Sequence, residues 1–442
     1  MQASPKTLYP QHFQTLTDIY NRALKNHQLD ELIVYSGSLN NVFRDHTPYP
    51  FRVNAQFKAL VPVCDNPYCW VIWRVEQKPT LLFYQPEDHW HYVPPTPNDY
   101  WTDYFDILCL KTPDEAKAHL GKNNARAFLG EVTTAIDQWP LGERNPTALV
   151  AELDWYRSIK SPYEQACLNQ ANLISVKGHR AAQEAFMAGA SEFDISLAFQ
   201  RACGQSDHQL PYPSIVGVNQ HAAILHYRAR EHQTIADQKR HSLLIDAGAE
   251  YQGYAADITR TYAYQDGPFA DLISALNEAQ LAMVDNVNPG QTHRAIDEDA
   301  FLRVGQLLNQ FDLLNMSPES AVETQVVNQF MPHTCGHFLG LQVHDVGGGI
   351  KSPKGEVLSR ENNKKARPER LVEAGQVMTI EPGIYFIDLL LKPLAAGPHK
   401  NAINWQKIDQ LKPFGGIRIE DNIVVGEQEN TNLTRRAFEA QT

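Results

Sequence analysis

Four acidic residues of the C-terminal half lie within apolar, strand-like segments, where an isolated carboxylate is costly to bury. The segments are LLIDAG, YAADITRT, MTIEPGIYF and GGIRIEDN, and the residues are Asp246, Asp257, Glu381 and Glu420. A further segment, PHTCGHFLGLQVHD, carries three histidines around a glycine-rich turn: His333, His337 and His344. Carboxylates and imidazoles are the side chains that bind divalent metals. Their gathering in one half of the chain predicts a metal site.

Each of these residues alone has an ordinary structural explanation. An aspartate at the end of a strand, such as Asp246, is usually a turn cap. Glu381 before Pro-Gly can simply end a strand, Glu420 can pair with Arg418, and a histidine pair is often part of a core. Four such acidic residues beside a histidine-rich turn are a harder coincidence. Together they favour the metal site.

The first two carboxylates belong to one predicted hairpin. The apolar run that ends at Asp246 and the run around Asp257 both have the composition of half-buried strands, and residues 251–253 join them. A turn centred between Tyr251 and Gln252 would place the two aspartates directly opposite each other. Like charges opposite each other destabilise a sheet, and a divalent cation between them would remove that cost.

The ligand types limit the metal. One imidazole among four carboxylates is a hard, oxygen-dominated set that suits Mn²⁺ or Co²⁺ and admits Zn²⁺ or Fe²⁺. Four carboxylates balance the formal charge of two divalent ions. Two such ions about 3.5 to 4 Å apart can share a water, lower its pKa and polarise a carbonyl group. The predicted chemistry is hydrolysis.

The composition is that of a soluble globular protein with room for two domains. The 442 residues include 39 basic and 51 acidic side chains, for a formal charge of −12, and no segment concentrates lysine and arginine. Nucleic acid and anionic membrane are therefore poor partners. No run reaches the roughly 18 apolar residues that a membrane span needs, and no apolar h-region opens the chain, so we expect a cytoplasmic protein. The six cysteines form no CxxC pair, and we expect neither disulfides nor structural zinc.

The first 157 residues predict an α/β domain that offers little chemistry. Apolar residues at helical spacing predict a helix over residues 10–28. Apolar runs predict strands over residues 31–37, 59–63, 69–75, 80–85, 106–110 and 126–131. His89 and His91 lie among aromatic residues and prolines, which favours packing or surface roles over metal binding.

A capping box opens the second part of the chain. Ser161, Pro162 and Glu164 occupy N-cap, first-turn and N3 positions, so we place the domain boundary at residue 158 and expect a helix that ends near Gly189. A second helix follows over residues 191–204. Strand-like segments then cover residues 214–218, 224–228, 241–264, 340–347, 376–386 and 415–425, with long connections at 351–370 and 388–416. Helices followed by strands indicate an α+β domain with an antiparallel sheet covered on one face.

The motifs resemble those of a known family. LLIDAGAEYQGYAADITRT, PHTCGHFLGLQVHD, TIEPGIYF and GIRIEDN resemble, in order and spacing, the metal-site motifs of the pita-bread metallopeptidases, which include methionine aminopeptidase, aminopeptidase P, prolidase and the metal-free creatinase. YPFRVNAQFKALVPVCDNPYCW, IKSPYEQACLNQAN and INWQKIDQLKPFGGIRIEDNIVV resemble more narrowly the bacterial prolidases that include the organophosphorus acid anhydrolases. The resemblance implies an α+β pita-bread domain over residues 158–442, a creatinase-like α/β domain over residues 1–157, and a homodimer.

The resemblance also implies two divalent metal ions, first of all Mn²⁺, with Co²⁺ or Zn²⁺ as alternatives. The implied ligands are Asp246, Asp257, His337, Glu381 and Glu420. Asp257 and Glu420 would bridge both ions. Asp246 would be a further ligand of one ion, and His337 and Glu381 would be further ligands of the other. Glu381 would also transfer protons for the bridging water.

Residues that contact the substrate are implied in the same way. His226 and His344 match the family's catalytic histidines, which stabilise an oxyanion and help to protonate the leaving nitrogen. Arg370 stands where prolidases bind the free carboxylate of the dipeptide, and Arg367 could take that role instead. The other implied pocket residues are Arg418, His333, Tyr212 and Asp45, the last contributed by a dimer partner.

The chain departs from the family pattern near these residues. Thr334, Cys335 and Phe338 interrupt the usual His-Gly-Leu-Gly-His-His motif, and the segment KKARPERLVEAG around Arg370 is unusual. His293 stands where close relatives often have tyrosine. All implied ligands are retained, so the departures bear on the range of substrates.

The implied activity is that of a metallo-dipeptidase that cleaves Xaa-Pro dipeptides through a metal-bridging hydroxide. Hydrolysis of organophosphorus triesters is an expected side activity, because a tetrahedral phosphorus centre resembles the tetrahedral intermediate of peptide hydrolysis. Two alternatives remain open: an aminopeptidase P type exopeptidase on longer Xaa-Pro peptides, and a catalytically silent binding protein with the same fold. Faster cleavage of tripeptides than of dipeptides would indicate the first, and a lack of bound metal the second.

Overall fold

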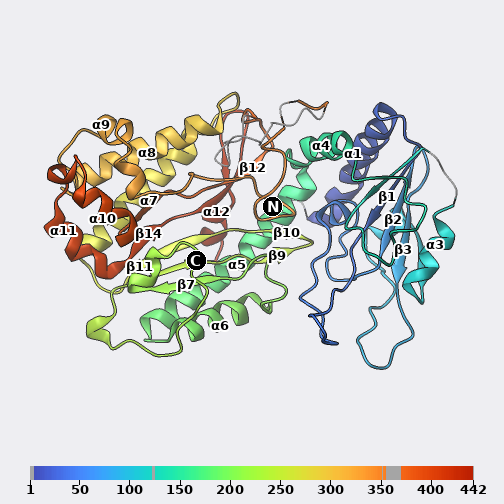
Figure 1. The fold of residues 1–442 in the computed structure, drawn as a ribbon, viewed down its shortest axis with the longest axis horizontal. Coiled ribbons are helices and arrows are strands. Elements are labelled where there is room, and N and C mark those ends of the chain that lie inside the picture. Colours follow the sequence, from blue (N-terminus) through green and yellow to red (C-terminus); the bar gives the residue numbers. More distant parts are fainter. Residues whose placement is uncertain (1–3, 122–124, 351, 355–369, 442) are drawn as a thin grey trace. The chain divides into compact units, whose positions relative to one another are not determined.

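The chain divides into two compact units. The computed structural model describes residues 4–121, 125–350, 352–354 and 370–441 (Figure 1). The first unit comprises residues 1–167 and 346–366, and the second comprises residues 168–345 and 367–442. The division after residue 167 falls within the first turns of helix α5 (Pro162–Met187), and the boundary at residue 158 stays a prediction.

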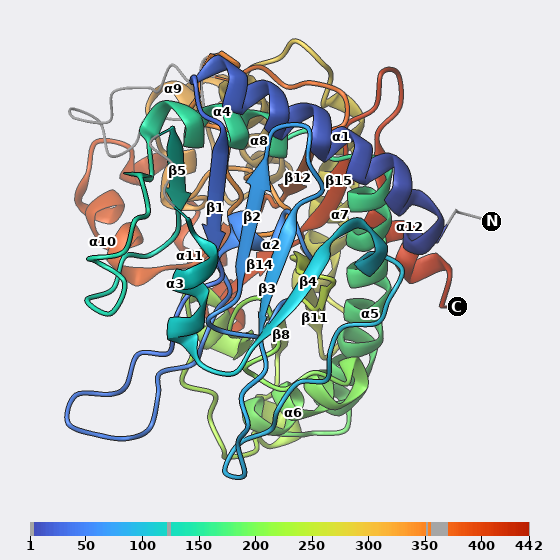
Figure 2. The same ribbon diagram turned by 90° about the vertical axis from the view of Figure 1, so that its right-hand side faces the viewer.

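The first unit is built on a mixed sheet with the strand order β4-β3-β2-β1-β5-β6, seen face-on in Figure 2. Its strands are β1 (Glu31–Tyr35), β2 (Trp70–Arg74), β3 (Thr80–Tyr84), β4 (Asp106–Leu110), β5 (Arg126–Leu129) and β6 (Glu143–Arg144). Its helices are α1 (Pro5–Asn26), α2 (Ala55–Lys58), α3 (Ala116–His119) and α4 (Thr147–Arg157). The central strands are apolar throughout because both faces of the sheet are covered: Trp70 contacts Trp139 on one face and Trp73 contacts Tyr20 of α1 on the other.

The predicted secondary structure of this unit is confirmed except for one strand. The α/β class, the helix and five of the predicted strands are present. Residues 59–63, however, follow the short helix α2 as a turn and an irregular segment. The side chain of Asn54 caps that helix by accepting the Gln56 N–H at 3.0 Å, and Pro62 has no N–H to give to a sheet.

The second unit is an α+β domain. Its helices are α5, α6 (Glu192–Cys203), α7 (Pro268–Asn286), α8 (His293–Gln310), α9 (Pro318–Glu323), α10 (Asp388–Ala396), α11 (Trp405–Leu411) and α12 (Leu433–Glu439). Its strands are β7 (Ile215–Val218), β8 (Ser242–Asp246), β9 (Glu250–Tyr251), β10 (Tyr254–Ala255), β11 (Thr259–Ala263), β12 (Val377–Ile380), β13 (Gly383–Tyr385), β14 (Gly416–Arg418), β15 (Asp421–Val424) and β16 (Thr431–Asn432). Among the described helices, none is long and apolar enough to cross a bilayer.

Two hydrophobic cores hold the strands of this unit in place. Helices α7 and α8 pack on β12, β14 and β15, where Leu276 and Val304 share a core with Ile380 and Ile417. Helices α5 and α6 pack on β7 and β8 through a second core that includes Phe199. An isolated bridge between Thr259 and Glu420 brings β11 beside the short segment that joins β14 to β15.

The hairpin that contains Asp246 and Asp257 forms, but its predicted register is wrong. Tyr251 pairs with Tyr254 and Asp246 pairs with Thr259, so the turn is centred between Gln252 and Gly253. Both turn residues have positive φ, 52° and 84°, as a two-residue hairpin turn of type I′ requires. The aspartates are therefore not cross-strand partners.

Two further predicted strands of this unit are also wrong. Residues 224–228 form a turn after the short helix η3 (Asn219–Ala223), and residues 340–347 form bends without a ladder. Gly347 has a φ of 107°, which an ordinary strand residue does not adopt. Residues 388–416 are a connection as predicted, but they contain α10 and α11. The predicted loop at 351–370 lies mostly outside the described residues.

Candidate metal centre

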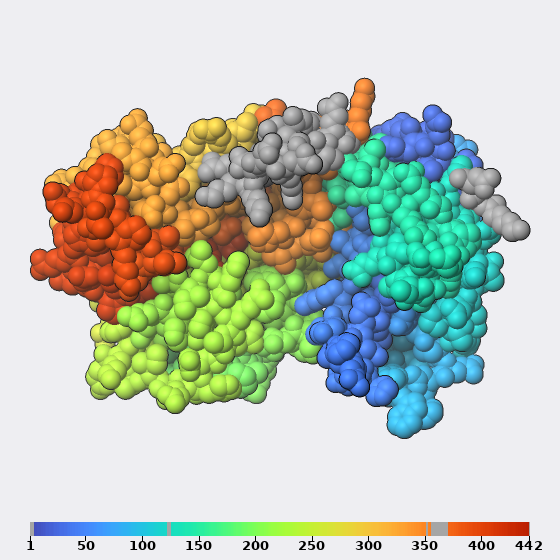
Figure 3. Space-filling view, viewed as in Figure 1, coloured from blue at the N-terminus to red at the C-terminus, as the bar shows by residue number. Residues whose placement is uncertain are grey.

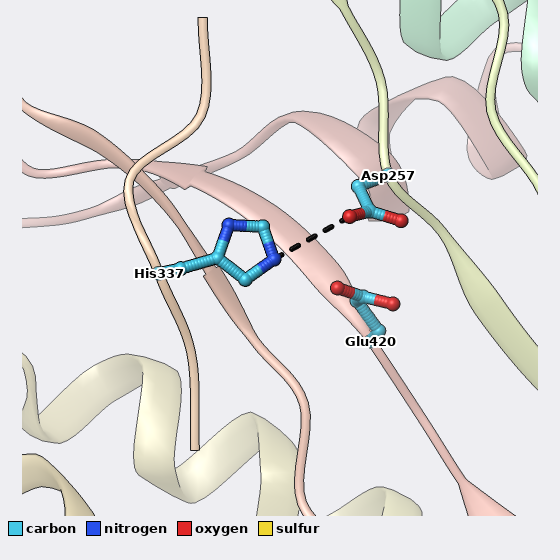
Figure 4. A group of neighbouring side chains, drawn as sticks. All are labelled: Asp257, His337 and Glu420. Atoms are coloured by element: carbon cyan, nitrogen blue, oxygen red, sulfur yellow. Dashed lines mark ion pairs between the residues drawn. The ribbon is translucent and has the colours of Figure 1, made fainter. Parts of the chain in front are cut away.

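Three side chains from separate parts of the second unit converge on one point. Asp257 lies between β10 and β11, His337 precedes β12, and Glu420 lies between β14 and β15. One potential ligand atom from each lies within 4.8 Å of the other two, and His337 Nε2 is 3.4 Å from Asp257 Oδ2 (Figure 4). Figure 3 shows dark red atoms, from the last residues of the chain, recessed between yellow-green atoms and yellow to orange atoms. These three side chains are a set that can hold a metal ion.

Asp246 joins this cluster through a shared phenol. The hydroxyl of Tyr212 lies 2.8 Å from Asp246 Oδ1 and 2.5 Å from Asp257 Oδ1. A phenol has one hydrogen, so it can donate to only one of these oxygens at a time. The other short contact requires a carboxyl proton or a cation in place of that proton. Burial raises the pKa of Asp246 to about 6, so this carboxyl group binds a proton more readily than an exposed aspartate does.

Arg418 is the guanidinium that faces the acidic cluster. Its Nη2 donates to Asp246 Oδ2 at 2.6 Å, its Nε donates to Thr259 Oγ1 at 3.1 Å, and its Nη1 donates to the Tyr385 hydroxyl at 2.9 Å. Thr259 in turn donates to Glu420 Oε2 at 2.7 Å. Ile417 and Ile419 point into the core, as the alternation along this segment predicts.

Glu381 lies beside two histidines. Its Oε1 is 3.7 Å from His337 Nε2 and its Oε2 is 3.9 Å from His333 Nδ1. The other ring nitrogen of His333, Nε2, is 2.9 Å from the Tyr385 hydroxyl. Burial raises the pKa of Glu381 to about 7, so this carboxyl group can hold or release a proton near neutrality. Burial lowers the pKa of His333 to about 4, so that ring is neutral.

The cluster carries more negative charge than its own donors neutralise. Burial and the charge of Asp257 raise the pKa of Glu420 well above its usual range. Burial opposes a charge on His337, yet its contact with Asp257 and the charge of Glu381 raise its pKa to about 9. Buried like charges that draw protons in this way are the arrangement that a bound divalent cation stabilises. The residues therefore fit a metal ion.

The backbone around His337 is fixed by a close approach to β12. The His337 N–H donates to Thr379 Oγ1 at 3.2 Å, and the Thr379 N–H donates to the His337 carbonyl at 2.9 Å. A Cβ on Gly336 would lie 2.0 Å from the Thr379 carbonyl oxygen, so only glycine fits there. The neighbouring departures from the family motif are used for packing: Cys335 is buried and Phe338 contacts the ring of His293.

The two predicted catalytic histidines lie near this cluster. The His344 ring stacks on His337, with 3.9 Å between ring centroids and 13° between planes. Partial burial and the nearby charges of His337 and His226 lower the pKa of His344. Both His226 and His344 are exposed, so a substrate can reach them.

The predicted substrate-binding residues lie in different surroundings. Arg370 is buried and its Nε donates to Glu373 Oε1 at 2.8 Å; together with burial, its charge lowers the pKa of His293 to about 4. Asp45 belongs to the first unit, where it is exposed and accepts the Thr47 N–H, and its place in a substrate pocket stays a prediction. Arg367 lies outside the described residues.

Sequence reasoning missed three residues that position this cluster. They are Tyr385, Thr259 and Asn422, whose side chain accepts the Asp257 N–H at 3.0 Å. Thr259 and Asn422 each lie two residues from a predicted ligand, on the same face of an extended segment, which is the signal that could have identified them. Tyr385 offered no such signal.

Two family models match the chain. The Xaa-Pro dipeptidase N-terminal domain matches residues 7–155, and metallopeptidase family M24 matches residues 166–427. Among curated proteins, the Xaa-Pro dipeptidase of Aeromonas hydrophila subsp. hydrophila is 45% identical over 437 residues, which cover 98% of this chain and 99% of that protein. The Xaa-Pro dipeptidase of Pseudoalteromonas atlantica is 45% identical over 434 residues, which cover 97% and 98% respectively.

Solved structures share the fold at low sequence identity. Zinc-substituted Escherichia coli aminopeptidase P in complex with product has a TM-score of 0.72 at 21% identity and covers all of both chains. Pseudomonas aeruginosa aminopeptidase PepP has a TM-score of 0.73 at 20% identity, covering 100% of this chain and 99% of that one. The predicted architecture, a pita-bread domain after a creatinase-like domain, is confirmed.

Proposed function

The chain belongs to metallopeptidase family M24, and from that membership we propose that it is an Xaa-Pro dipeptidase whose two divalent metal ions bind at the cluster of Asp257, His337 and Glu420. The observation that carries the proposal is the full-length similarity to two curated Xaa-Pro dipeptidases at 45% identity. The convergence of three potential metal ligands also supports the proposal, because a metallopeptidase needs a metal site.

A dedicated enzyme for this bond has a physical reason. The amide nitrogen of proline carries no hydrogen and is part of a ring, and its cis and trans forms interconvert slowly. A general peptidase that recognises the scissile N–H therefore has no donor to bind. A site that acts on the carbonyl group and the free ends of the dipeptide avoids this difficulty.

The proposed ligands are Asp246, Asp257, His337, Glu381 and Glu420, with Mn²⁺ as the preferred metal. An oxygen-rich set with one imidazole suits Mn²⁺ better than a sulfur-rich zinc site would. When bound, two divalent ions would supply an activated water for attack and would polarise the scissile carbonyl. Arg418 and Thr259 hold Asp246 and Glu420 in their orientations by hydrogen bonds.

The remaining proposed residues handle protons and the substrate. Glu381 takes up a proton, as its raised pKa allows. His226 and His344 stabilise the developing oxyanion and help to protonate the leaving proline nitrogen. Arg370 binds the carboxylate one residue beyond the scissile bond and so limits substrates to dipeptides. The proposed pocket residues on the other side are Tyr212, His333 and Asp45.

Substrate length tests this proposal. With Mn²⁺ present, we expect Ala-Pro and Leu-Pro to be cleaved at least tenfold faster than Ala-Pro-Ala, because only the dipeptides place a carboxylate at Arg370. The substitutions Arg370→Met and Arg367→Met, assayed on the same substrates, would show which arginine binds it. Faster cleavage of Ala-Pro-Ala by the unchanged enzyme would assign the chain to the aminopeptidase P type instead.

Three finer proposals have their own tests. A slow hydrolysis of organophosphorus triesters follows from the tetrahedral geometry that the two reactions share, and it should be lost with the metal. Homodimer formation would let Asp45 reach a partner's site, and sedimentation at assay concentrations would measure it. A cytoplasmic location would be tested by cell fractionation.

A further inference from the structure

A buried glutamate outside the metal cluster organises the loop between β7 and β8. Glu192, the first residue of α6, is 3% exposed. Its Oε1 accepts the Val218 N–H at 2.7 Å and lies 2.8 Å from His221 Nδ1. Its Oε2 accepts the Tyr227 hydroxyl and the Glu231 N–H, at 2.7 and 2.8 Å. One carboxylate therefore has four partners in the segment 218–231, which we name the 218–231 loop.

These partners lie on both sides of His226. Val218 is the last residue of β7 and the first of the 218–231 loop, Tyr227 directly follows His226, and Glu231 ends the loop. The His221 ring stacks on Tyr227, with 4.5 Å between centroids and 24° between planes, so the two side chains that Glu192 holds also support each other. The position of His226 thus depends on a carboxylate that does not itself belong to the metal cluster.

The base of the loop has a second, independent anchor. The side chain of Asn219 accepts the N–H groups of His241 and Ser242, at 2.8 and 3.2 Å, and donates to the Lys239 carbonyl at 2.7 Å. These bonds tie the start of the loop to β8 without Glu192. A change at Glu192 should therefore loosen the part of the loop around His226 without unfolding the domain.

We propose that Glu192 is a positioning residue that holds His226 toward the substrate by fixing the 218–231 loop. The inference rests on the proposed function of His226. A carboxylate is the suitable group because each of its oxygens accepts one backbone N–H, from Val218 and from Glu231. Glutamine has the same size, but in either orientation it presents its own NH₂ to one of those N–H groups.

A double-mutant cycle tests whether Glu192 acts through His226. The variants are Glu192→Gln, His226→Ala and the double substitution, assayed with Mn²⁺ on Leu-Pro. We expect Glu192→Gln alone to lower kcat roughly tenfold or more with KM nearly unchanged, because a catalytic group is misplaced. In the His226→Ala background the same substitution should change kcat by less than about twofold. Hydrogen–deuterium exchange of the 218–231 loop should become faster in Glu192→Gln.

A matched control is Glu152→Gln in the first unit. Glu152 is also buried and also contacts a histidine, with its Oε1 2.9 Å from Asn26 Nδ2 and its Oε2 3.0 Å from His27 Nε2. This control should leave kcat and loop exchange unchanged. Equal losses of kcat from Glu192→Gln in both backgrounds, or unchanged exchange of the loop, would overturn the inference. A fully active His226→Ala would overturn it together with the proposed role of His226, whereas a slow His226→Ala without coupling would overturn this inference alone.

Discussion

The carboxyl groups of the candidate metal site have too few hydrogen-bond donors around them. Tyr212 places a single hydrogen between Asp246 and Asp257. Arg418 donates to Asp246 and to Thr259, and Thr259 passes a hydrogen bond to Glu420. Among the described residues, these hydrogen-bond donors include one positively charged guanidinium, that of Arg418, whereas several carboxyl groups lie around it. The arrangement of the side chains therefore fits a bound cation, which would neutralise the charge of these carboxyl groups.

Substitution of Glu420 separates metal binding from folding. We expect Glu420→Gln to lose Mn²⁺ binding, because an amide cannot replace the carboxylate charge. The metal-free protein should lose less than about 1 kcal/mol of unfolding free energy, because a neutral group relieves repulsion among buried acids. Isothermal titration with Mn²⁺ and urea unfolding in chelator would measure the two effects.

The control for this experiment is Glu427→Gln, a change at an exposed glutamate of the same C-terminal segment. It should bind Mn²⁺ like the unchanged protein. Wild-type affinity in Glu420→Gln would contradict the assignment of Glu420 as a ligand.

The burial of His179 predicts how the unfolding free energy of the protein depends on pH. This ring is fully buried, its Nε2 lies 2.9 Å from the Ala247 carbonyl, and its Nδ1 has no partner among the described residues. Burial lowers its pKa from 6.5 to about 3, so the folded protein keeps it neutral while the unfolded chain binds a proton below pH 6.5. The stability that this ring contributes is complete above pH 6.5 and falls as the pH drops toward 3.

Urea unfolding of metal-free protein at pH 7 and pH 5 would measure this contribution. Between these values the unchanged protein should lose up to about 2 kcal/mol more unfolding free energy than His179→Gln, which keeps a donor but does not titrate. An identical loss in both proteins would show that His179 is protonated in the folded state.

Helices and strands differ in how well local sequence predicts them. The capping box at Ser161 and Glu164 is present, with the Ser161 N–H donating to Glu164 Oε2 at 2.8 Å, and α6 ends at Gly204 with a φ of 68°. Helices α7 and α8 were not anticipated, although Pro268 stands in the first turn of one and Thr292 caps the other. The wrong strands, such as 224–228, have strand composition but no neighbouring strand to pair with, which local sequence cannot reveal.

The hairpin turn gives a prediction at the scale of an element. Gly253→Ala should lower the unfolding free energy by about 1 kcal/mol or more, because alanine resists the φ of 84° that this turn requires. The control is Gly305→Ala within α8, where an added Cβ would meet Pro318 at an ordinary 3.4 Å. Helix propensity there should leave stability unchanged or slightly higher. Equal destabilisation by both substitutions in urea unfolding would contradict the turn assignment.

The whole molecule brings together segments that are far apart in the sequence. Side-chain types and a family resemblance were sufficient to predict Asp257, His337 and Glu420, which the fold gathers within 4.8 Å. The contact of Tyr385 with Arg418 could not be predicted, because it depends on how β13 and β14 lie beside each other. The wrong hairpin register shows the same limit, since the aspartates meet through Tyr212 and not across a ladder.

Metal removal should act on the second unit alone. Because the proposed ligands all belong to that unit, Mn²⁺ at a hundredfold excess over its Kd should stabilise it by about 2.7 kcal/mol for each ion that binds. Chelator should abolish cleavage of Leu-Pro and speed hydrogen exchange in β8, β11, β12 and β15. The sheet of the first unit should exchange at the same rate with and without metal. Equal loss of protection in both units would contradict this account.

Anomalous diffraction from crystals soaked in Mn²⁺ tests the central claim most directly. The account predicts two manganese peaks in contact with the carboxylates of Asp257 and Glu420, one of them also bound by His337. Peaks elsewhere in the second unit, or no peak while these three side chains keep the positions described above, would contradict it.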